Sequence, residues 1–340
     1  MKEIPYSPFA DYSVANFSQY QKNPMLMFGK LEILRDLIQQ QVGQIQRGYF
    51  IGDRSIILGV RGLGKTTALY FVKETLEAND IQVVTLSRLF TNEEHFMSLN
   101  GGKSISDLII RGKEKRPLYI LVDFPDMKDV KQGKLEKFLA YLWSLISDEE
   151  IYNYVSLIFA MNESHYDKSF KYSEILGKFL TLRLEHYTYD QTEELLASRM
   201  KIIDKNIEEI FNRSSIEVIH SYSKGIPRNI LTAANLLVAH AKDLPIKEGL
   251  TSDILSQKFV DRLISDRVEN EELRNKYLAI VKVLRELTDP PQELFLRKLS
   301  EYKIASRTTA LKHLDKLVAI GAIKFTRGGY NQVQKTWSLC

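Results

Sequence analysis

One short stretch of the chain has the residue types and the spacing that bind phosphate groups. Residues 59–67 read Gly-Val-Arg-Gly-Leu-Gly-Lys-Thr-Thr and fit the pattern G-x-x-x-x-G-K-[ST] at every fixed position. In such a loop the glycines let backbone N–H groups point at phosphate oxygens, the lysine reaches the outer phosphates and the following hydroxyl holds Mg²⁺. The pattern therefore predicts a phosphate-binding loop, whose contact residues are Gly59, Arg61, Gly62, Leu63, Gly64, Lys65, Thr66 and Thr67.

The flanking sequence predicts the two elements that such a loop must join. Ser55–Leu58 is short and apolar and is typical of a buried strand, and Thr66–Ala78 has apolar residues at helical spacing. A helix that begins at the loop directs the positive end of its dipole at a bound anion. This context disfavours the alternative of a chance glycine-rich turn.

A second apolar strand ends in a carboxylate. Leu118–Asp123 is apolar up to its last residue, so we expect Asp123 beside the phosphate loop, binding Mg²⁺ directly or through water. Many ATPases have glutamate at the next position to polarise the attacking water, but this chain has Phe124, followed by Pro125 and Asp126. Two interpretations stay open: Asp126 reaches the water, or Asp126 is a turn residue after proline and hydrolysis is slow.

Other parts of the pattern predict the rest of a layered domain. Asn162 follows a buried strand at Val155–Ala160, where its side chain can contact the outer phosphate or the water. Met1–Gly29 is an aromatic arm that either lines an adenine pocket or packs as plain core on the nucleotide domain. Further strands are predicted at Ile81–Leu86 and Leu180–Leu184. Helices are predicted at Leu31–Gln46, Glu93–Leu99, Ile105–Ile110, Leu135–Ile146, Gln191–Lys201, Ile207–Phe211, Ile216–Ser223, Asn229–Asp243 and Ile254–Val268.

The last 70 residues predict three helices and a hairpin, the order of a winged helix-turn-helix. The helices are Tyr277–Leu287, Glu293–Tyr302 and Ser306–Ile320, with Ser306 as N-cap of the third. The hairpin runs from Ile323 to Leu339. On the third helix we expect Leu311, Leu314, Leu317 and Val318 to face inward and Arg307, Thr308, Lys312, His313 and Lys316 to face outward.

The exposed side of this module suits DNA. We expect Arg307 and Thr308 to read bases in the major groove and Lys316 to contact phosphates. Arg327, at the wing tip, suits a phosphate or minor-groove contact, and Lys312 lies on the same surface as the helix residues. From Glu271 to Cys340 there are 13 Lys or Arg and 7 Asp or Glu, a net charge of +6 within a chain of net charge +4. The alternatives are a solvated charged surface and a winged helix used only for protein contacts.

Composition excludes several classes of protein. The single cysteine, Cys340, is the last residue, so no disulfide forms within the chain, which suits a reducing intracellular compartment. No apolar run approaches the length of a membrane span, and residues 1–10 lack the apolar core of a secretory signal. The predicted location is the cytoplasm, associated with the nucleoid.

Together these residues resemble the AAA+ ATPases, and most of all the initiator-type, origin-recognition-like ATPases with a C-terminal winged helix. Gly59–Thr67 is similar to Walker A, Val122-Asp123 to Walker B, Asn162 to sensor 1 and Gly225-Ile226-Pro227-Arg228 to sensor 2. Residues 186–188, His-Tyr-Thr, are similar to the entry to the family's helical lid.

The resemblance implies cofactors, partners and further site residues. ATP and Mg²⁺ are the implied cofactors and double-stranded DNA the implied partner, with self-association left open. Arg228 would contact the outer phosphate from the lid, and Tyr187 would contact the nucleotide. Candidates for an arginine finger are Arg183 and Lys178. The implied catalytic set is Asp126, Asn162 and Arg228, and the implied metal ligands are Thr66 and Asp123.

The predicted fold class is α/β, with a P-loop (AAA+) parallel-sheet core and a helical lid, followed by a winged helix-turn-helix domain. The expected boundaries are 1–185 for the core with its arm, 186–250 for the lid, 251–270 for a linker helix and 271–340 for the winged helix. The expected function is that of a replication-initiator or origin-recognition-like ATPase, hydrolysing ATP slowly to ADP and phosphate. The alternatives are a nucleotide-gated regulator with little or no hydrolysis, and a transposition or repair ATPase that binds duplex DNA without sequence preference.

Overall fold

The structure is a computed structural model of the 340-residue chain. It describes residues 9, 30–86, 116–123, 140, 143–144, 147, 152–163, 166, 176–241, 243–268, 270–287, 290–327 and 335–339. The chain divides into two compact units, one of residues 13–187 and one of residues 1–12 with 188–340. The helices predicted at Glu93–Leu99 and Ile105–Ile110, and most of the one at Leu135–Ile146, lie outside the described residues.

A parallel sheet forms the centre of the first unit. Its described strands lie in the order β2-β3-β4-β1-β5, and every neighbouring pair is parallel. Their bounds are β1 Arg54–Leu58, β2 Gln82–Leu86, β3 Leu118–Asp123, β4 Val155–Met161 and β5 Leu180–Arg183. The strands β1 and β4 are mostly apolar and are buried along their whole length, as strands of a covered parallel sheet should be. Each strand predicted from the sequence forms, with ends shifted by at most one residue.

Because the strands are parallel, their carboxyl ends share one edge of the sheet. Leu58, the last residue of β1, pairs with Met161 of β4 on one side and Arg183 of β5 on the other. Asp123, the last residue of β3, pairs with Ala160. The register therefore brings the ends of β3, β4, β1 and β5 to nearly the same level, where the predicted phosphate loop begins.

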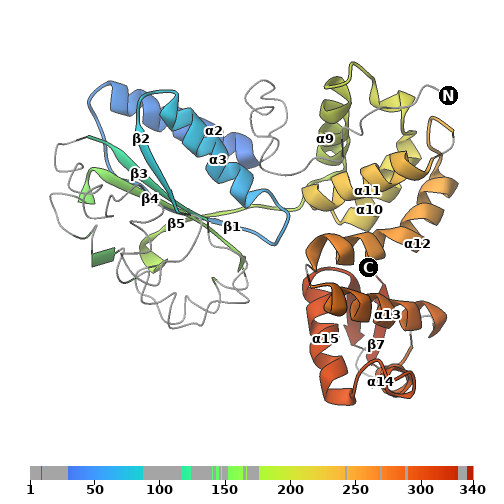
Figure 1. The fold of residues 1–340 in the computed structure, drawn as a ribbon. Helices are drawn as coiled ribbons and strands as arrows, with labels where there is room; N and C mark the ends of the chain where they lie inside the picture. Colours follow the sequence, from blue (N-terminus) through green and yellow to red (C-terminus); the bar gives the residue numbers. More distant parts are fainter. Residues whose placement is uncertain are drawn as a thin grey trace. The chain divides into compact units, whose positions relative to one another are not determined.

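Two helices cover one side of this sheet (Figure 1). Helix α3 (Lys65–Glu77) packs against β2, β3 and β4, and α2 (Lys30–Gln46) packs against α3. The side-chain amide of Gln41 ties α2 to the amino ends of the strands, since it accepts from the Tyr119 hydroxyl at 2.9 Å and donates to the Asp53 carboxylate at 3.1 Å. A short helix, η5 (Leu176–Lys178), precedes β5.

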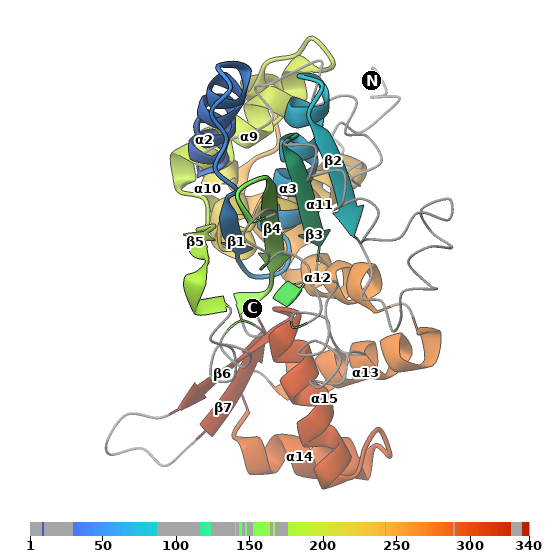
Figure 2. The same ribbon diagram turned by 90° about the vertical axis from the view of Figure 1, so that its left-hand side faces the viewer.

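Helices dominate the second unit (Figures 1 and 2). In chain order they are α9 Tyr189–Lys201, η6 Ile207–Glu209, α10 Arg213–Ser223, α11 Pro227–His240 and α12 Glu248–Arg267. Thr188 and Gln191 form a capping box at the start of α9, and the Asn212 side chain accepts from the backbone N–H of Ser215 at the start of α10. The helix expected at Ile207–Phe211 is only a single 3-10 turn.

The aromatic arm packs differently from the expectation at the one residue of it that is described. Phe9 is fully buried, with its ring 5.8 Å from that of Phe211 in the helical unit. At this position the side chain therefore contributes to the core of the helices and not to the parallel sheet.

The C-terminal part has three helices followed by an antiparallel hairpin. The helices are α13 Glu271–Leu287, α14 Gln292–Glu301 and α15 Arg307–Ala319, and the strands are β6 Ile323–Arg327 and β7 Lys335–Leu339. Figure 2 shows the hairpin beside α15, which contacts β6. This is the predicted winged-helix order. No helix among the described residues is long and apolar enough to cross a membrane.

Candidate functional site

The loop between β1 and α3 needs its glycines for two different reasons. Gly62 and Gly64 have φ angles of 97° and 96°, in the left-handed region that side chains disfavour. Gly59 is required by close approach instead. A Cβ at Gly59 would lie 3.1 Å from Leu63 Cδ1 and 3.3 Å from Leu184 Cβ. The loop is thus both curled and tightly packed.

The side chain of Lys65 folds back across this loop. Lys65 is the first residue of α3, and its ammonium group donates to the carbonyl oxygens of Gly59 at 2.8 Å and Val60 at 3.0 Å. A lysine held this way places a positive charge next to the loop's backbone and at the positive end of the helix dipole. The arrangement suits the binding of an anion.

The hydroxyl of Thr66 and the carboxylate of Asp123 come together at the carboxyl edge of the sheet. Thr66 Oγ1 donates to Asp123 Oδ2 at 2.7 Å, although the two residues are 57 positions apart. Mg²⁺ is a hard cation that takes oxygen ligands, usually one or two protein groups together with phosphate oxygens and water. The two side chains therefore fit Mg²⁺. Nowhere in the described part of the chain do three or more His, Cys, Asp or Glu residues form a metal-binding group.

Asn162 lies where the sequence predicts, immediately after β4. Since Met161 pairs with Leu58, Asn162 is level with Gly59 at the start of the loop, and β4 separates β1 from β3. Its side chain is half-buried and has interactions within the structure. Its contact with a phosphate or a water stays a prediction.

An ion pair spans the end of β1. Arg183, at the end of β5, lies 3.2 Å from the carboxylate of Glu163, which follows Asn162. The order β4-β1-β5 means that these side chains reach across the strand that leads into the phosphate loop. Lys178, the other arginine-finger candidate, lies over the Trp143 ring at 5.2 Å. Both candidates thus have partners within their own unit.

The other predicted nucleotide contacts are partly covered. Leu63 is buried, whereas Arg61, Thr67 and Tyr187 are half-buried. Tyr187 lies in the connection after β5, three residues beyond the Leu184 side chain that packs on Gly59. Phe124 and Asp126 lie outside the described residues.

Arg228 begins a helix, as the sequence predicts. Lys224 and Gly225 have φ angles of 55° and 66° after the end of α10, and Pro227 is the first residue of α11. Arg228, the second residue, is half-buried and belongs to the helical unit. Its approach to a phosphate stays a prediction.

The predicted DNA-contact residues of α15 are exposed. This holds for Arg307, Thr308, Lys312 and Lys316. Arg307 already has a partner that the sequence analysis did not identify, because its guanidinium forms a bidentate ion pair with Glu293 of α14 at 2.7 and 2.9 Å. Arg327 ends β6 and pairs with Lys335 of β7.

Two assignments to the faces of α15 are wrong. His313 is not outward: it is half-buried, its ring lies 5.5 Å from that of Tyr277, and neither ring nitrogen has a hydrogen-bond partner among the described residues. Val318 is not inward but 41% exposed. The buried stripe is Ala310, Leu314 and Leu317, and His313 lies beside it because it is three residues after Ala310 and four before Leu317.

Ser306 occupies the N-cap position of α15 but does not cap it with its side chain. The hydroxyl donates to Thr309 Oγ1 at 3.0 Å and accepts no bond from the helix backbone. The predicted position is therefore right and the predicted hydrogen bond is wrong, because a neighbouring hydroxyl competes for the side chain.

Comparison with known proteins finds likeness at the level of fold. No protein-family model and no curated protein matches the sequence. Among solved structures, the ORC1 protein of Aeropyrum pernix in complex with DNA is similar with a TM-score of 0.56 and 14% identity, covering 91% of this chain and 88% of that one. The Aeropyrum pernix ORC2 protein (ADPNP-ADP complexes) is similar with a TM-score of 0.51 and 15% identity, covering 91% and 89%. The chain therefore shares the fold of these two proteins.

Proposed function

We propose that this chain binds Mg²⁺-ATP on the loop between β1 and α3 and binds double-stranded DNA through its C-terminal helices and hairpin, as a replication-initiator type of ATPase. The observation that carries the proposal is the 2.7 Å contact between Thr66 and Asp123 at the end of the curled, lysine-covered loop. A structure of the same fold is in complex with DNA, which supports the DNA-binding part.

The proposal gives each group at the sheet edge a role. Lys65 binds the outer phosphates, and Thr66 and Asp123 hold Mg²⁺, which neutralises phosphate charge when bound. Asn162 orients the outer phosphate or the attacking water. From the helical unit, Arg228 distinguishes ATP from ADP. We also propose that the chain associates with itself and that it is located in the cytoplasm, at the nucleoid.

Lys65→Ala tests the nucleotide site. The substitution removes a charge-assisted phosphate contact worth about 1.5–3 kcal/mol, so the ATP affinity should fall at least about tenfold, as measured by titration calorimetry. Lys73→Ala is the matched control, because Lys73 lies on the same helix and, among the described residues, forms an ion pair with Glu77 at 3.6 Å. Unchanged ATP affinity in a folded Lys65→Ala protein would refute the assignment.

A second candidate function, a nucleotide-gated regulator with little hydrolysis, is favoured by Phe124 after Asp123. A phenyl ring cannot polarise water, so we expect slow turnover with and without DNA. Phe124→Glu should then raise the rate of phosphate release. Fast turnover in the wild type that disappears in Asp126→Asn would identify Asp126 as the working carboxylate instead.

Retention of genomic fragments tests the DNA-binding part. The protein should retain a restricted set of fragments from a fragmented genome in the presence of ATP, and sequencing identifies them. Even retention of all sequences would favour the transposition or repair alternative.

A further inference from the structure

The last side chain of α12 joins two helix ends that lie far apart in the sequence. Arg267 Nη2 donates to Asn229 Oδ1 at 2.5 Å, and Arg267 Nη1 donates to the carbonyl oxygen of Ile320. Asn229 directly follows Arg228 in the first turn of α11, and Ile320 is the C-cap of α15. One guanidinium therefore contacts both the start of the predicted nucleotide-sensing helix and the end of the predicted DNA-reading helix.

The contact is chemically specific at both ends. The carboxyl end of a helix carries unpaired carbonyls and the negative end of the dipole, which a cation satisfies. Asn229 is 4% exposed, and its Nδ2 donates to the carbonyl oxygen of Ser223 at the end of α10 at 3.4 Å, which orients Oδ1 toward Arg267. A planar guanidinium can donate to two acceptors in a fixed geometry, which an ammonium group cannot.

The rest of α12 packs on both groups of helices through apolar contacts. Phe259 of α12 packs edge-on to Tyr222 of α10, with ring centroids 6.2 Å apart. Val260, Ile264 and Val268 belong to the buried cluster of α13, α14 and α15. Apolar contacts are not directional. The hydrogen bonds from Arg267 to Asn229 and to Ile320 are directional. Arg267 is thus suited to fix how α15 is held relative to the start of α11.

We propose that Arg267 is a positioning residue that transmits the nucleotide-dependent placement of Arg228, through Asn229, to α15. The proposal rests on the proposed function for its nucleotide and DNA ligands. A ligand that shifts Arg228 shifts the neighbouring Asn229, and Arg267 carries that shift to the end of α15. By linkage, DNA must then change the affinity for ATP by the same factor as ATP changes the affinity for DNA.

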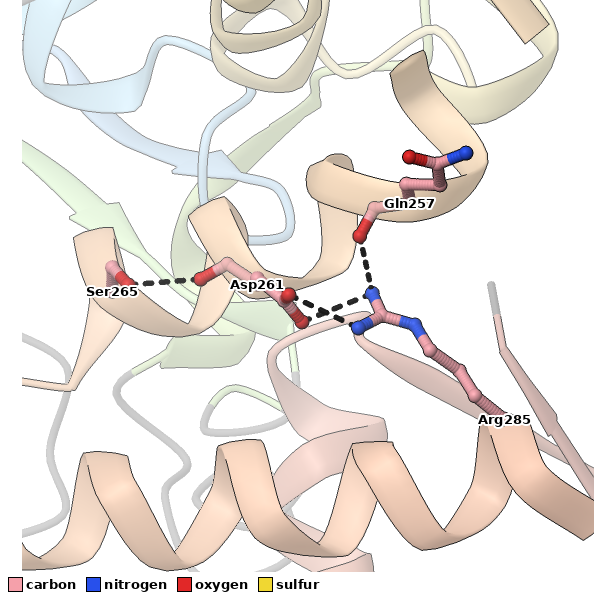
Figure 3. Close-up of polar contacts among 4 residues, drawn as sticks. All are labelled: Gln257, Asp261, Ser265 and Arg285. Carbon is pink, nitrogen blue, oxygen red and sulfur yellow. Dashed lines mark hydrogen bonds and ion pairs between the residues drawn. The ribbon is translucent and has the colours of Figure 1, made fainter. Parts of the chain in front are cut away.

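A second arginine that contacts α12, Arg285, provides a matched control. Arg285 of α13 forms an ion pair with Asp261 of α12 at 3.0 Å and donates to the Gln257 carbonyl oxygen at 2.7 Å, and Ser265 donates to the carbonyl oxygen of Asp261 (Figure 3). This pair ties α13 to α12. Within the described part of the chain, the hydrogen bonds of Arg285 go to α12 alone, so removing its side chain perturbs the same part of the fold without the proposed connection.

Hydrogen exchange without any ligand tests the physical connection. In Arg267→Ala, amide exchange should rise in residues 226–231 and in residues 317–323, whereas Arg285→Ala should leave residues 226–231 unchanged. Arg267→Lys, which keeps the charge, should show the same pattern to a smaller extent. A rise confined to one of the two segments would overturn the proposal.

Duplex binding in ATP and in ADP tests the transmission. In the wild type the two DNA affinities should differ by a factor of about 5 or more, the lower end of typical coupling. In Arg267→Ala the factor should fall below about 2, with the ATP affinity itself little changed, while Arg285→Ala keeps the wild-type factor. A wild-type factor in Arg267→Ala, or equal DNA affinities in ATP and ADP in the wild type, would overturn the inference.

Failure of the proposed function looks different, because the wild type would then bind no ATP or no duplex. The hydrogen-exchange experiment would still decide whether Arg267 joins the two helices.

Discussion

Single side chains determine how the C-terminal helices respond to pH. Burial lowers the pKa of His313 below its usual value near 6.5, and the positive charges of Lys276 and Lys316 lower it further. The ring packs edge-on to Tyr277. In the unfolded chain the imidazole returns to its ordinary pKa, so between the two values the unfolded state binds more protons than the folded state. The free energy of unfolding therefore keeps its full value above about pH 6.5. It decreases as the pH drops from there toward and through the lower folded-state pKa.

His313→Leu should flatten this pH dependence. We expect the difference in unfolding free energy between pH 7.5 and pH 5 to be smaller in the variant than in the wild type, measured by urea denaturation. Burial also lowers the pKa of His220, so part of the slope remains. His186→Gln, at an exposed position after β5, is the control. An unchanged slope in His313→Leu would show that the imidazole is accessible to protons in the folded state.

At the scale of elements, α14 supplies the ion-pair partner of Arg307, a predicted DNA-contact residue of α15. Glu293 of α14 pairs with Arg307 at the start of α15, and both side chains are about two-thirds exposed, at 67% and 64%. Such an exposed pair contributes only about 0–1 kcal/mol. If Arg307 binds DNA as proposed, this pair must break or be shared, and the carboxylate then competes with the nucleic acid.

Glu293→Gln should therefore strengthen DNA binding, by a factor of about 2–5 for a pair of this energy. Glu301→Gln is the matched control, because it removes the same charge from the same helix. Glu301 pairs with Lys298 at 2.8 Å and not with Arg307. Titration of both variants with a labelled duplex at two salt concentrations separates the general charge effect from the specific one. Equal gains in the two variants would mean that Arg307 does not contact DNA.

At the scale of the whole molecule, α12 packs on the C-terminal helices as well as on the helices before it. Val260 and Ile264, 2% and 0% exposed, lie in the same buried cluster as Phe295 and Leu314. Each fully buried aliphatic side chain stabilises the fold by about 1.5–3 kcal/mol, against a total of about 5–15 kcal/mol for a typical domain. The domain limits 1–185, 186–250, 251–270 and 271–340 remain proposals, and this packing makes the last one testable.

A fragment of residues 248–340 should unfold cooperatively, whereas a fragment of residues 271–340 should be much less stable or aggregate. The physical reason is the loss of three buried apolar side chains from one core. Thermal unfolding followed by circular dichroism measures the difference. Equal melting temperatures would show that the three C-terminal helices and the hairpin fold without α12.

The residue types and spacing within short stretches of the sequence were enough to predict the phosphate loop and the strands of the sheet. The fixed spacing of Gly59, Gly64 and Lys65 and the continuous apolar runs of the strands depend on backbone conformation and burial, which neighbouring residues control. The start of α11 at Pro227 follows for the same reason. Periodicity alone misassigned His313 and Val318, because the buried face of a helix is set by what packs against it, and a one-residue error in phase exchanges neighbouring positions.

Contacts between residues distant in the chain were decided only by the tertiary structure. The ion pair of Arg307 with Glu293 and the double contact of Arg267 both depend on how the helices pack. No local pattern marks the partners, because a carboxylate or an asparagine in a helix is usually only a solvated side chain. Consecutive residues therefore suffice to predict the phosphate loop, whereas the connection between α11 and α15 exists only once the chain is folded.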